Sequence, residues 1–431
     1  MTILQFRNHR KVLSHPHLAF TKDQAIRNET IESGGASEGG ETSGGGASRP
    51  DDISAYLEKC VRAGIMPGGV LAIRGGTAES GWALRAFGNL GVTRQIAPVT
   101  GDAVYDLASV TKILSTTALV MAASDRGLTG GLDAPLASFG WTGPSDTVSL
   151  TIRNLLSHRS GLPAWRPLYL LGGTTREERS GLAREAILRE RPLFPQGSGT
   201  LYSDLGFMLL GFLAEELLGG PLDELFRREV AGPLGLGGSG FGPLAAGGFA
   251  RGETDSGAAG DGPPGKGGGL PVAPTEDGFR CGGPTGWPGV PILGPVPPGR
   301  VHDDNAAWLG GAAGHAGLFA RAADVMRVVD SWLESFRGSG GTVSRRTVTE
   351  FLSLQGPENE EGRRGLGFDA TAAPSGRGVL FGHKGYTGTA VWFDPAGCGA
   401  LVLLCNRVHP TARRGGMDAV RAALLELAFG A

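Results

Sequence analysis

A serine and a lysine three positions apart are the residues of this chain best suited to nucleophilic chemistry. Ser109 and Lys112 belong to the segment LASVTK, which opens a run of apolar residues with helical spacing over residues 106–126. Because positions i and i+3 share one helix face, the amine of Lys112 can reach the hydroxyl of Ser109. Free backbone N–H groups at the start of a helix favour a developing oxyanion. The spacing therefore predicts a serine nucleophile with a lysine base.

The apolar surroundings of Lys112 strengthen this interpretation. Val110, Ile113 and Leu114 flank it, and desolvation of a lysine lowers its pKa, which allows the neutral amine to act as a base. No other serine in the chain has a lysine three residues later. The alternative is a helix-capping serine beside a solvated lysine, and this spacing alone does not exclude it.

A second candidate element is the sequence Tyr202-Ser203-Asp204, which leads into a strongly apolar helix expected over residues 205–218. A tyrosine on a loop that enters a helix can lie over a cleft and relay a proton, and Asp204 can bind the lysine. The alternative is a packing tyrosine followed by an aspartate that caps the helix.

The third element is HKGYTG, residues 383–388, between two predicted strands. Gly385 leaves room where a substrate backbone approaches a strand, and a nearby backbone N–H can complete an oxyanion hole. The alternative is a hairpin turn that carries a surface lysine at position 384.

The elements that must position these residues suggest an α/β (α+β) fold. Alternating or continuous apolar runs predict strands at 68–74, 81–88, 378–383, 388–395 and 399–407, which we expect to form one five-stranded sheet. Helical spacing predicts helices at 51–64, 150–158, 205–218, 322–336 and 415–429. The segment at about 127–375 is then an insertion made mainly of helices and loops.

The chain divides into a tail and one domain. Residues 33–48 form a Gly/Ser/Glu linker, so we expect disorder over 1–50 and an ordered domain over 51–431. Residues 232–300 are rich in glycine and proline without periodicity, which suggests a lid or rim. The first twenty residues lack the apolar stretch of a secretory signal, which favours a cytoplasmic location and leaves a periplasmic one open if the start is misassigned.

Composition excludes several classes of function. Forty basic against 42 acidic residues leave no excess charge for a nucleic acid, and no apolar run is long enough for a membrane span. None of the four cysteines forms a CxxC pair, and we expect Cys398 and Cys405 to be buried and unpaired.

Three further patterns are judged to be chance matches. A GxSxG at residues 35–39 lies in the linker, and a GxxxxGK at 260–266 lacks the preceding strand. His302, Asp303, Asp304 and His315 do not have the spacing of a helical ligand pair, so we expect loop caps and no metal site.

The three elements, in this order, resemble the motifs of the serine β-lactamase-like superfamily, which includes class C β-lactamases, penicillin-binding D-alanyl-D-alanine carboxypeptidases and related carboxylesterases. The stretches LLSHRSGLP, FPQG and AGHAGLF are also typical of it, and the resemblance covers residues 51–431. Two positions depart from the family pattern: Asp204 stands in place of asparagine and His383 in place of lysine. The extra carboxylate favours a charged Lys112 and shifts base duty toward Tyr202, and the missing cation weakens the grip on a substrate carboxylate.

The resemblance implies acyl transfer through an acyl-enzyme without a metal or organic cofactor. Ser109 attacks the carbonyl, Lys112 and Tyr202 move its proton, and the backbone N–H groups of Ser109 and Tyr386 bind the oxyanion. Asp204, His383 and Gly385 line the substrate-binding site.

The resemblance leaves several substrates open. His383 favours a carboxylesterase first, then a D-Ala-type peptidase, and a β-lactamase last; a catalytically silent binding domain is the alternative from a different class. The expected partners are small ester, peptide or β-lactam-like substrates, and the sequence does not specify an oligomeric state.

Overall fold

The computed structural model describes residues 50–77, 79–244, 269–278, 280–281, 292–358 and 362–430. All of them belong to one compact unit, Gly46–Ala431. The predicted disorder of the tail lies outside the described residues, and so does about half of the Gly/Pro-rich segment for which a lid was suggested.

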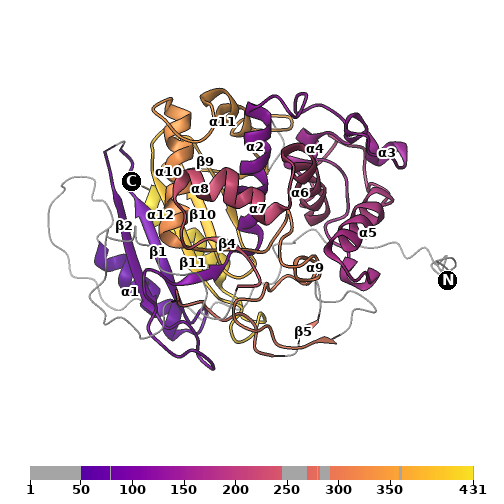
Figure 1. Cartoon of the computed structure of the whole chain (residues 1–431). Helices are drawn as coiled ribbons and strands as arrows, with labels where there is room; N and C mark the ends of the chain where they lie inside the picture. Colours follow the sequence, from indigo (N-terminus) through magenta and orange to yellow (C-terminus); the bar gives the residue numbers. More distant parts are fainter. Residues whose placement is uncertain are drawn as a thin grey trace. The chain divides into compact units, whose positions relative to one another are not determined.

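A six-stranded antiparallel sheet forms the centre of the fold, with the strand order β2-β1-β11-β10-β9-β8 (Figure 1). Its strands are, in chain order, β1 (Gly68–Arg74), β2 (Trp82–Gly88), β8 (Asp369–Ala372), β9 (Val379–Lys384), β10 (Ala390–Phe393) and β11 (Ala400–Cys405). The predicted fold class is confirmed, but the prediction of five strands is wrong. The additional strand β8 is a partly buried edge strand, and its four-residue sequence DATA alternates polar residues only with the small side chain of alanine, which is too short and weak a signal to recognise.

Two smaller sheets lie in the segment between β2 and β8. One has the order β3-β7-β4, formed by β3 (Val104–Asp106), β7 (Leu318–Arg321) and β4 (Gly240–Phe241). The other pairs β5 (Arg280–Cys281) with β6 (Ile292–Leu293). The antiparallel β3–β7 pairing joins segments about two hundred residues apart, and it brings the loop before Leu318 next to the start of the Ser109 helix.

The helices agree with most of the predicted positions. They are α1 (Pro50–Arg62), α2 (Ala118–Asp125), α3 (Ser145–Val148), α4 (Ile152–Leu156), α5 (Arg176–Leu188), α6 (Asp204–Leu218), α7 (Leu222–Phe226), α8 (Gly232–Leu234), α9 (Asp304–Trp308), α10 (Ala322–Arg337), α11 (Arg345–Phe351) and α12 (Met417–Phe429). Shorter irregular turns are η1 (Ala108–Val110), η2 (Lys112–Thr117), η3 (Leu136–Phe139), η4 (Leu168–Leu171) and η5 (Arg227–Ala231).

The predicted continuous helix over residues 106–126 is wrong in its first half. The chain runs as strand β3 to Asp106, makes a 3₁₀ turn (η1) and a π-helical segment (η2), and becomes α-helical only at Ala118. The pairing with β7 is extended by a hydrogen bond from Leu107 N to the Leu318 carbonyl (2.9 Å), so a helix cannot begin before Ala108. Irregular helical segments of this kind often occur at functional sites.

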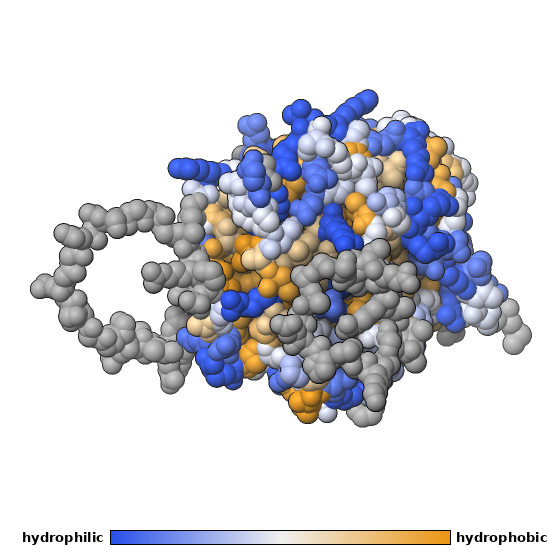
Figure 2. Space-filling model, turned by 60° about the vertical axis from the view of Figure 1, so that its left-hand side comes forward, coloured by the Kyte–Doolittle hydropathy of each residue, from blue (hydrophilic) through white to orange (hydrophobic). Residues whose placement is uncertain are grey.

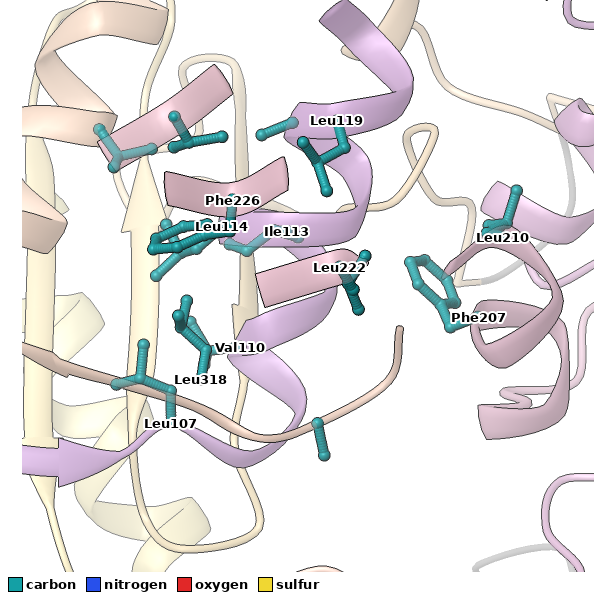
Figure 3. Close-up of a cluster of buried hydrophobic side chains, with 14 of the residues drawn as sticks. Leu107, Val110, Ile113, Leu114, Leu119, Phe207, Leu210, Leu222, Phe226 and Leu318 are labelled. Atoms are coloured by element: carbon teal, nitrogen blue, oxygen red, sulfur yellow. The ribbon is translucent and has the colours of Figure 1, made fainter. Parts of the chain in front are cut away.

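Each face of the main sheet is covered by its own apolar core, as the period of two along a strand requires. On one face, Leu71, Leu401 and Leu403 pack with residues of α1 and α12, such as Leu57 and Leu424. The opposite face contributes to a larger core that includes the first helix after β3 and the buried helix α6. Figure 3 shows part of this core, in which Leu107, Val110, Ile113 and Leu114 of the Ser109 segment point among residues of other elements such as Leu318 and Phe226.

A cleft of about 960 Å³ opens on the α1 and α12 side of the sheet. Its lining includes apolar residues of α1, β1, β2 and the end of α12, namely Ile53, Leu71, Ile73, Leu84, Leu427 and Phe429. Figure 2, which turns the left side of Figure 1 forward, shows apolar residues gathered on that side among polar ones. None of the predicted site residues lines this cleft.

Two composition-based expectations can be compared with the described residues. Cys398 and Cys405 are buried and free, as predicted. Among the described helices, no single one is long and apolar enough to cross a membrane; α6 and the segment Leu222–Leu234 meet the length and composition test only as a pair bent by 71°. The apolar residues of α6 from Leu205 to Ala214 are buried in the protein core.

Candidate active site

The turn that carries Ser109 is held by the carboxylate of Asp106. Asp106 Oδ1 accepts a hydrogen bond from the Ala108 backbone N–H (2.9 Å), and Oδ2 accepts one from the His302 backbone N–H (2.8 Å). Ala108 has a φ of 46°, a left-handed conformation that non-glycine residues adopt only under constraint. Ser109 is partly exposed while its neighbours on both sides are buried, so the constrained turn presents this one side chain to the solvent side.

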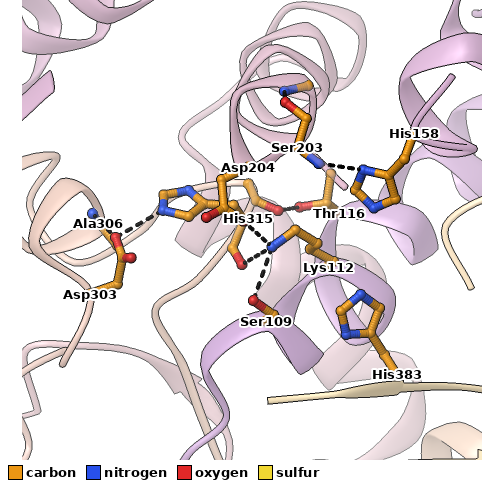
Figure 4. A network of polar contacts seen from close by, with 12 residues as sticks. Ser109, Lys112, Thr116, His158, Ser203, Asp204, Asp303, Ala306, His315 and His383 are labelled. Atoms are coloured by element: carbon orange, nitrogen blue, oxygen red, sulfur yellow. Dashed lines mark hydrogen bonds and ion pairs between the residues drawn. The ribbon is translucent and has the colours of Figure 1, made fainter. Parts of the chain in front are cut away.

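Lys112 is the hub of the polar network in Figure 4. Its side chain is fully buried, and its Nζ donates to Ser109 Oγ (3.1 Å), Asp204 Oδ1 (2.7 Å) and the His315 carbonyl (3.0 Å). An ammonium group has three N–H donors, and each of them has an acceptor here. The predicted contact between Lys112 and Ser109 is confirmed, and the network fits a protonated lysine.

The electrostatic balance at Lys112 differs from the simple expectation of a desolvated neutral amine. Burial by itself lowers the pKa of Lys112, but the charge of Asp204 and the proximity of Tyr202 outweigh it and raise the pKa above its usual value. The expectation of a lowered pKa is therefore wrong, whereas the expectation that Asp204 favours the charged lysine is confirmed.

Tyr202 lies against the same ammonium group. Lys112 Nζ is 4.9 Å from the centre of the Tyr202 ring, and the ring also contacts the rings of His158 and His383 at centroid distances of 4.6 and 5.9 Å. Burial raises the pKa of Tyr202, and the charge of Lys112 opposes this shift without cancelling it. The second motif is thus beside the first, as the sequence predicted.

His158 is a site residue that the sequence motifs did not identify. Its Nδ1 accepts a hydrogen bond from the Ser203 backbone N–H (3.0 Å), which fixes the Tyr202–Asp204 segment at the start of α6. Burial and the nearby charges of Arg364 and Lys112 lower the pKa of His158 well below its usual value, so the ring is neutral. The sequence signal was the family-typical stretch LLSHRSGLP, which contains His158, but no spacing connected this histidine with the other candidate residues.

His383 occupies the position at which the family pattern has a lysine, and it carries no charge at neutral pH. Its Nδ1–H donates to the Lys384 carbonyl (2.9 Å), its side chain is buried, and burial lowers its pKa to about 4. In the described part of the chain Nε2 has no hydrogen-bond partner. Lys384 is exposed, on the opposite face of β9, as the strand period predicts.

The buried neutral His383 predicts that acid destabilises the protein. The unfolded chain takes up a proton near the ordinary pKa of 6.5, whereas the native imidazole does so only near 4. The contribution of the neutral His383 to the free energy of unfolding is therefore fully present above pH 6.5. It is lost as the pH falls from 6.5 to 4, and the loss amounts to roughly 3 kcal/mol. Urea unfolding of the wild type and of His383→Asn at several pH values measures this contribution. Between pH 6.5 and 4, the slope of the unfolding free energy against pH should be smaller in the variant by the equivalent of about one bound proton. Equal slopes would contradict the account.

Gly385 is required by packing inside the protein. A Cβ at this position would collide with the side chain of Thr389 and would lie 2.6 Å from the Leu107 carbonyl oxygen. Thr389 Oγ1 donates to that same carbonyl (3.0 Å), and Thr387 Oγ1 donates to the Asp106 carbonyl (2.7 Å). The β9–β10 turn is thereby fixed to the nucleophile turn; a contact of Gly385 with substrate stays a prediction.

Tyr386 stands at the tip of this turn and is 54% exposed. Its ring contacts the His302 ring at a centroid distance of 5.7 Å and lies 4.7 Å from the Arg407 guanidinium. The predicted role belongs to its backbone N–H, and the two threonine bonds hold that peptide close to the Ser109 segment.

Asp303, which precedes α9, and His315, in the loop between α9 and β7, hold these two segments together. His315 Nε2 bonds Asp303 Oδ1 (2.8 Å), and the same oxygen caps α9 by accepting from Ala306 N (2.8 Å). Asp303 thus has the capping role that the sequence suggested. Within the described ranges, no group of three or more His, Cys, Asp or Glu side chains is arranged to hold a metal ion.

Comparison with known proteins identifies the family. The profile of the family described as Beta-lactamase matches residues 53–426. The chain belongs to this family. A curated relative from Escherichia coli O157:H7, named "Putative D-alanyl-D-alanine carboxypeptidase", is 31% identical over 351 residues, which are 76% of this chain and 74% of the relative.

Solved structures of other hydrolases share the fold. EstCE1, described as a hydrolase with promiscuous acyltransferase activity, superimposes with a TM-score of 0.63 at 21% identity over 88% of this chain and 98% of its own. The D-amino acid amidase of Ochrobactrum anthropi SV3 in complex with D-phenylalanine has a TM-score of 0.59 at 20% identity, with the same coverages. The predicted resemblance to the serine β-lactamase-like superfamily is confirmed, and with it the membership in a serine hydrolase family.

Proposed function

We propose that this chain is a serine hydrolase that cleaves ester or amide bonds through an acyl-enzyme on Ser109. The observation that supports this most strongly is that Ser109, Tyr202 and Asp204 all lie against the buried ammonium group of Lys112. These groups come from segments 92 residues apart, and a merely structural serine does not need a buried lysine in contact with its hydroxyl.

The saturated lysine determines how the proton moves. Because all three N–H groups of Lys112 are engaged, Ser109 Oγ accepts a hydrogen bond from it and cannot also give it a proton. We therefore assign the base to the Tyr202 oxygen. Because the pKa of Tyr202 is raised, its phenolate beside the ammonium of Lys112 is the minor, reactive form, which becomes more populated as the pH rises. As the bond from Ser109 Oγ to the carbonyl carbon forms, the serine proton passes to Tyr202, which then gives it to the leaving group. Water releases the acyl group by the reverse path.

The substitution Asp204→Asn tests this assignment through the pH profile. Removal of the carboxylate charge lowers the pKa of both Lys112 and Tyr202, because Asp204 raises both in the wild type. The ascending limb of kcat/KM against pH is expected to move to lower pH by about 1–3 units, the usual effect of one nearby charge. A stopped-flow profile with a p-nitrophenyl ester measures it. An unmoved limb, with Ser109 still required, would contradict the assignment of the base.

Two substrate classes fit this proposal, each on its own observation. The neutral His383 favours a carboxylesterase, because the third motif offers no cation of its own. The name of the relative that is 31% identical favours a D-alanyl-D-alanine carboxypeptidase.

Turnover of a short p-nitrophenyl ester beside a chromogenic cephalosporin tests the proposed function. Ester hydrolysis that requires Ser109, with the cephalosporin left intact, is the expected result. Cephalosporin turnover would rank the β-lactamase activity higher than we place it. Silence on both, together with no covalent labelling by a fluorophosphonate, would identify a binding domain and refute the proposal.

A further inference from the structure

The apolar cleft on the α1 and α12 side of the main sheet is separate from the candidate active site. Side chains alternate along β1, so Leu71 and Ile73 line the cleft, whereas Val70 and Ala72 belong to the core that surrounds the Ser109 segment. The sheet therefore lies between the cleft and the nucleophile. None of the residues that line the cleft takes part in the mechanism proposed above.

The walls of the cleft are apolar and accessible. Leu84 of the edge strand β2 is 42% exposed. Four other apolar lining residues are partly exposed, namely Ile53, Ile73, Leu427 and Phe429. Glycine and alanine supply nine of the twenty lining residues, so short side chains keep the space open. Its volume of about 960 Å³ is in the range of pockets that enclose a small organic ligand.

The charged residues of the lining give the cleft an excess of positive charge. They are Arg74, Arg85, Arg377 and Asp394. Arg74 is satisfied within the protein, because its Nε forms an ion pair with Asp330 (3.2 Å) and its Nη1 donates to the Cys398 carbonyl (2.6 Å). Arg74 is also buried, so it offers little to a ligand.

Arg85 and Arg377 form the exposed cationic margin of the cleft. Within the described ranges, neither guanidinium has an ion pair or a hydrogen bond. Arg85 pairs in register with Leu71, and opposite residues of paired strands project from the same face, so its side chain leaves the sheet on the cleft side. Arg377 lies in the turn between β8 and β9, at the other end of the lining. The cleft thus combines an apolar interior with uncompensated positive charge at its margin.

We propose that this cleft binds one long-chain carboxylate, with the hydrocarbon chain along the apolar lining and the carboxylate at the cationic margin. Burial of methylene groups favours the chain through the hydrophobic effect, and a carboxylate matches the planar fork of a guanidinium. A neutral chain would leave both arginines unused, and a cationic one would be repelled by them. The inference is independent of the function proposed for Ser109.

Fluorescence titration of the full-length protein with 11-(dansylamino)undecanoic acid tests this proposal. We expect one saturable site per chain, from which hexadecanoate displaces the probe at least about tenfold more effectively than hexadecanol or hexadecyltrimethylammonium, the size expected for a charged hydrogen bond. The variant Arg85→Gln/Arg377→Gln should weaken hexadecanoate binding about 10–100-fold for the same reason. Arg191→Gln/Arg345→Gln removes two exposed charges outside the cleft and should bind like the wild type.

The variant Ala83→Trp tests the apolar part of the site. Ala83 is exposed, lines the cleft and lies in a strand, where tryptophan is well accepted. The large ring should fill the cleft and abolish saturable binding, while the urea unfolding curve stays close to that of the wild type.

Several results would overturn the inference. They are a wild type that does not bind the probe, hexadecanol bound as tightly as hexadecanoate, and cleft arginine variants that bind like the wild type. Loss of binding after fluorophosphonate labelling of Ser109 would place the ligand in the active site. A wild-type dimer in light scattering that Ala83→Trp dissociates would show that a second copy of the chain covers the cleft.

Discussion

Substitution of Ser109 by alanine is expected to reduce kcat for ester hydrolysis by at least about 10⁴-fold, because removal of the nucleophile leaves only the oxyanion site and substrate binding. The fold should survive, since Ser109 is partly exposed and Lys112 keeps two acceptors, Asp204 and the His315 carbonyl. Initial rates at saturating ester and a urea unfolding curve measure the two effects.

Ser115→Ala is the matched control for that substitution. Ser115 lies six residues further along the same helical segment, it is buried, and its hydroxyl has no partner in the described structure. Its loss should leave kcat within about twofold and stability unchanged or slightly higher. If Ser109→Ala kept more than a few per cent of the activity, the nucleophile would have to be sought elsewhere.

Substitution of Lys112 by methionine should remove both activity and stability. Met has a similar length but leaves the largely buried Asp204 carboxylate without its 2.7 Å partner. Loss of one member of a buried ion pair costs about 3–5 kcal/mol, and we expect the lower end because Asp204 keeps 18% exposure. The rate should fall at least about 10³-fold, since the proton relay loses the cation that stabilises the Tyr202 phenolate. Urea unfolding and ester kinetics give the two values.

A second variant separates these two losses. Lys112→Met/Asp204→Leu removes both charges, and replacing a whole buried pair by apolar residues is often neutral or stabilising. Stability should return to near the wild-type value, whereas activity should not return. Recovery of activity with stability would mean that Lys112 serves only the fold, and the proposed mechanism would be wrong.

The chemistry-bearing residues could be predicted because their spacing is local. Ser109 and Lys112 are three positions apart, so a single turn, even an irregular one, places them on the same side, and Nζ lies 3.1 Å from Oγ. The main strands could be predicted for a similar reason, since β1 and β11 carry their burial pattern in their own residues.

The irregular start of the Ser109 helix could not be predicted in the same way. It is determined by the pairing of β3 with β7 and by the bonds of Thr387 and Thr389 to the carbonyls of Asp106 and Leu107. These partners are two to three hundred residues away in the chain, and no local pattern reports them.

The charge state of Lys112 followed from the departure of Asp204 from the family pattern and not from the residues around the lysine in the sequence. Burial of Lys112 suggested a neutral amine, but the contact with Asp204, 92 residues later, reverses the direction of its pKa shift. His158 was not assigned as a site residue because its contacts, the Tyr202 ring and the Ser203 N–H, lie more than forty residues later in the chain. Edge strand β8 has too little burial to mark it.

Covalent labelling tests the central claim most directly. The full-length protein is treated with a fluorophosphonate, its intact mass is measured, and the modified peptide is sequenced by mass spectrometry, with Ser109→Ala and Ser115→Ala in parallel. We predict a single adduct on Ser109 in the wild type and in Ser115→Ala, and none in Ser109→Ala. An adduct on another residue, or a Ser109→Ala variant labelled like the wild type, would contradict the assignment of Ser109 as the nucleophile.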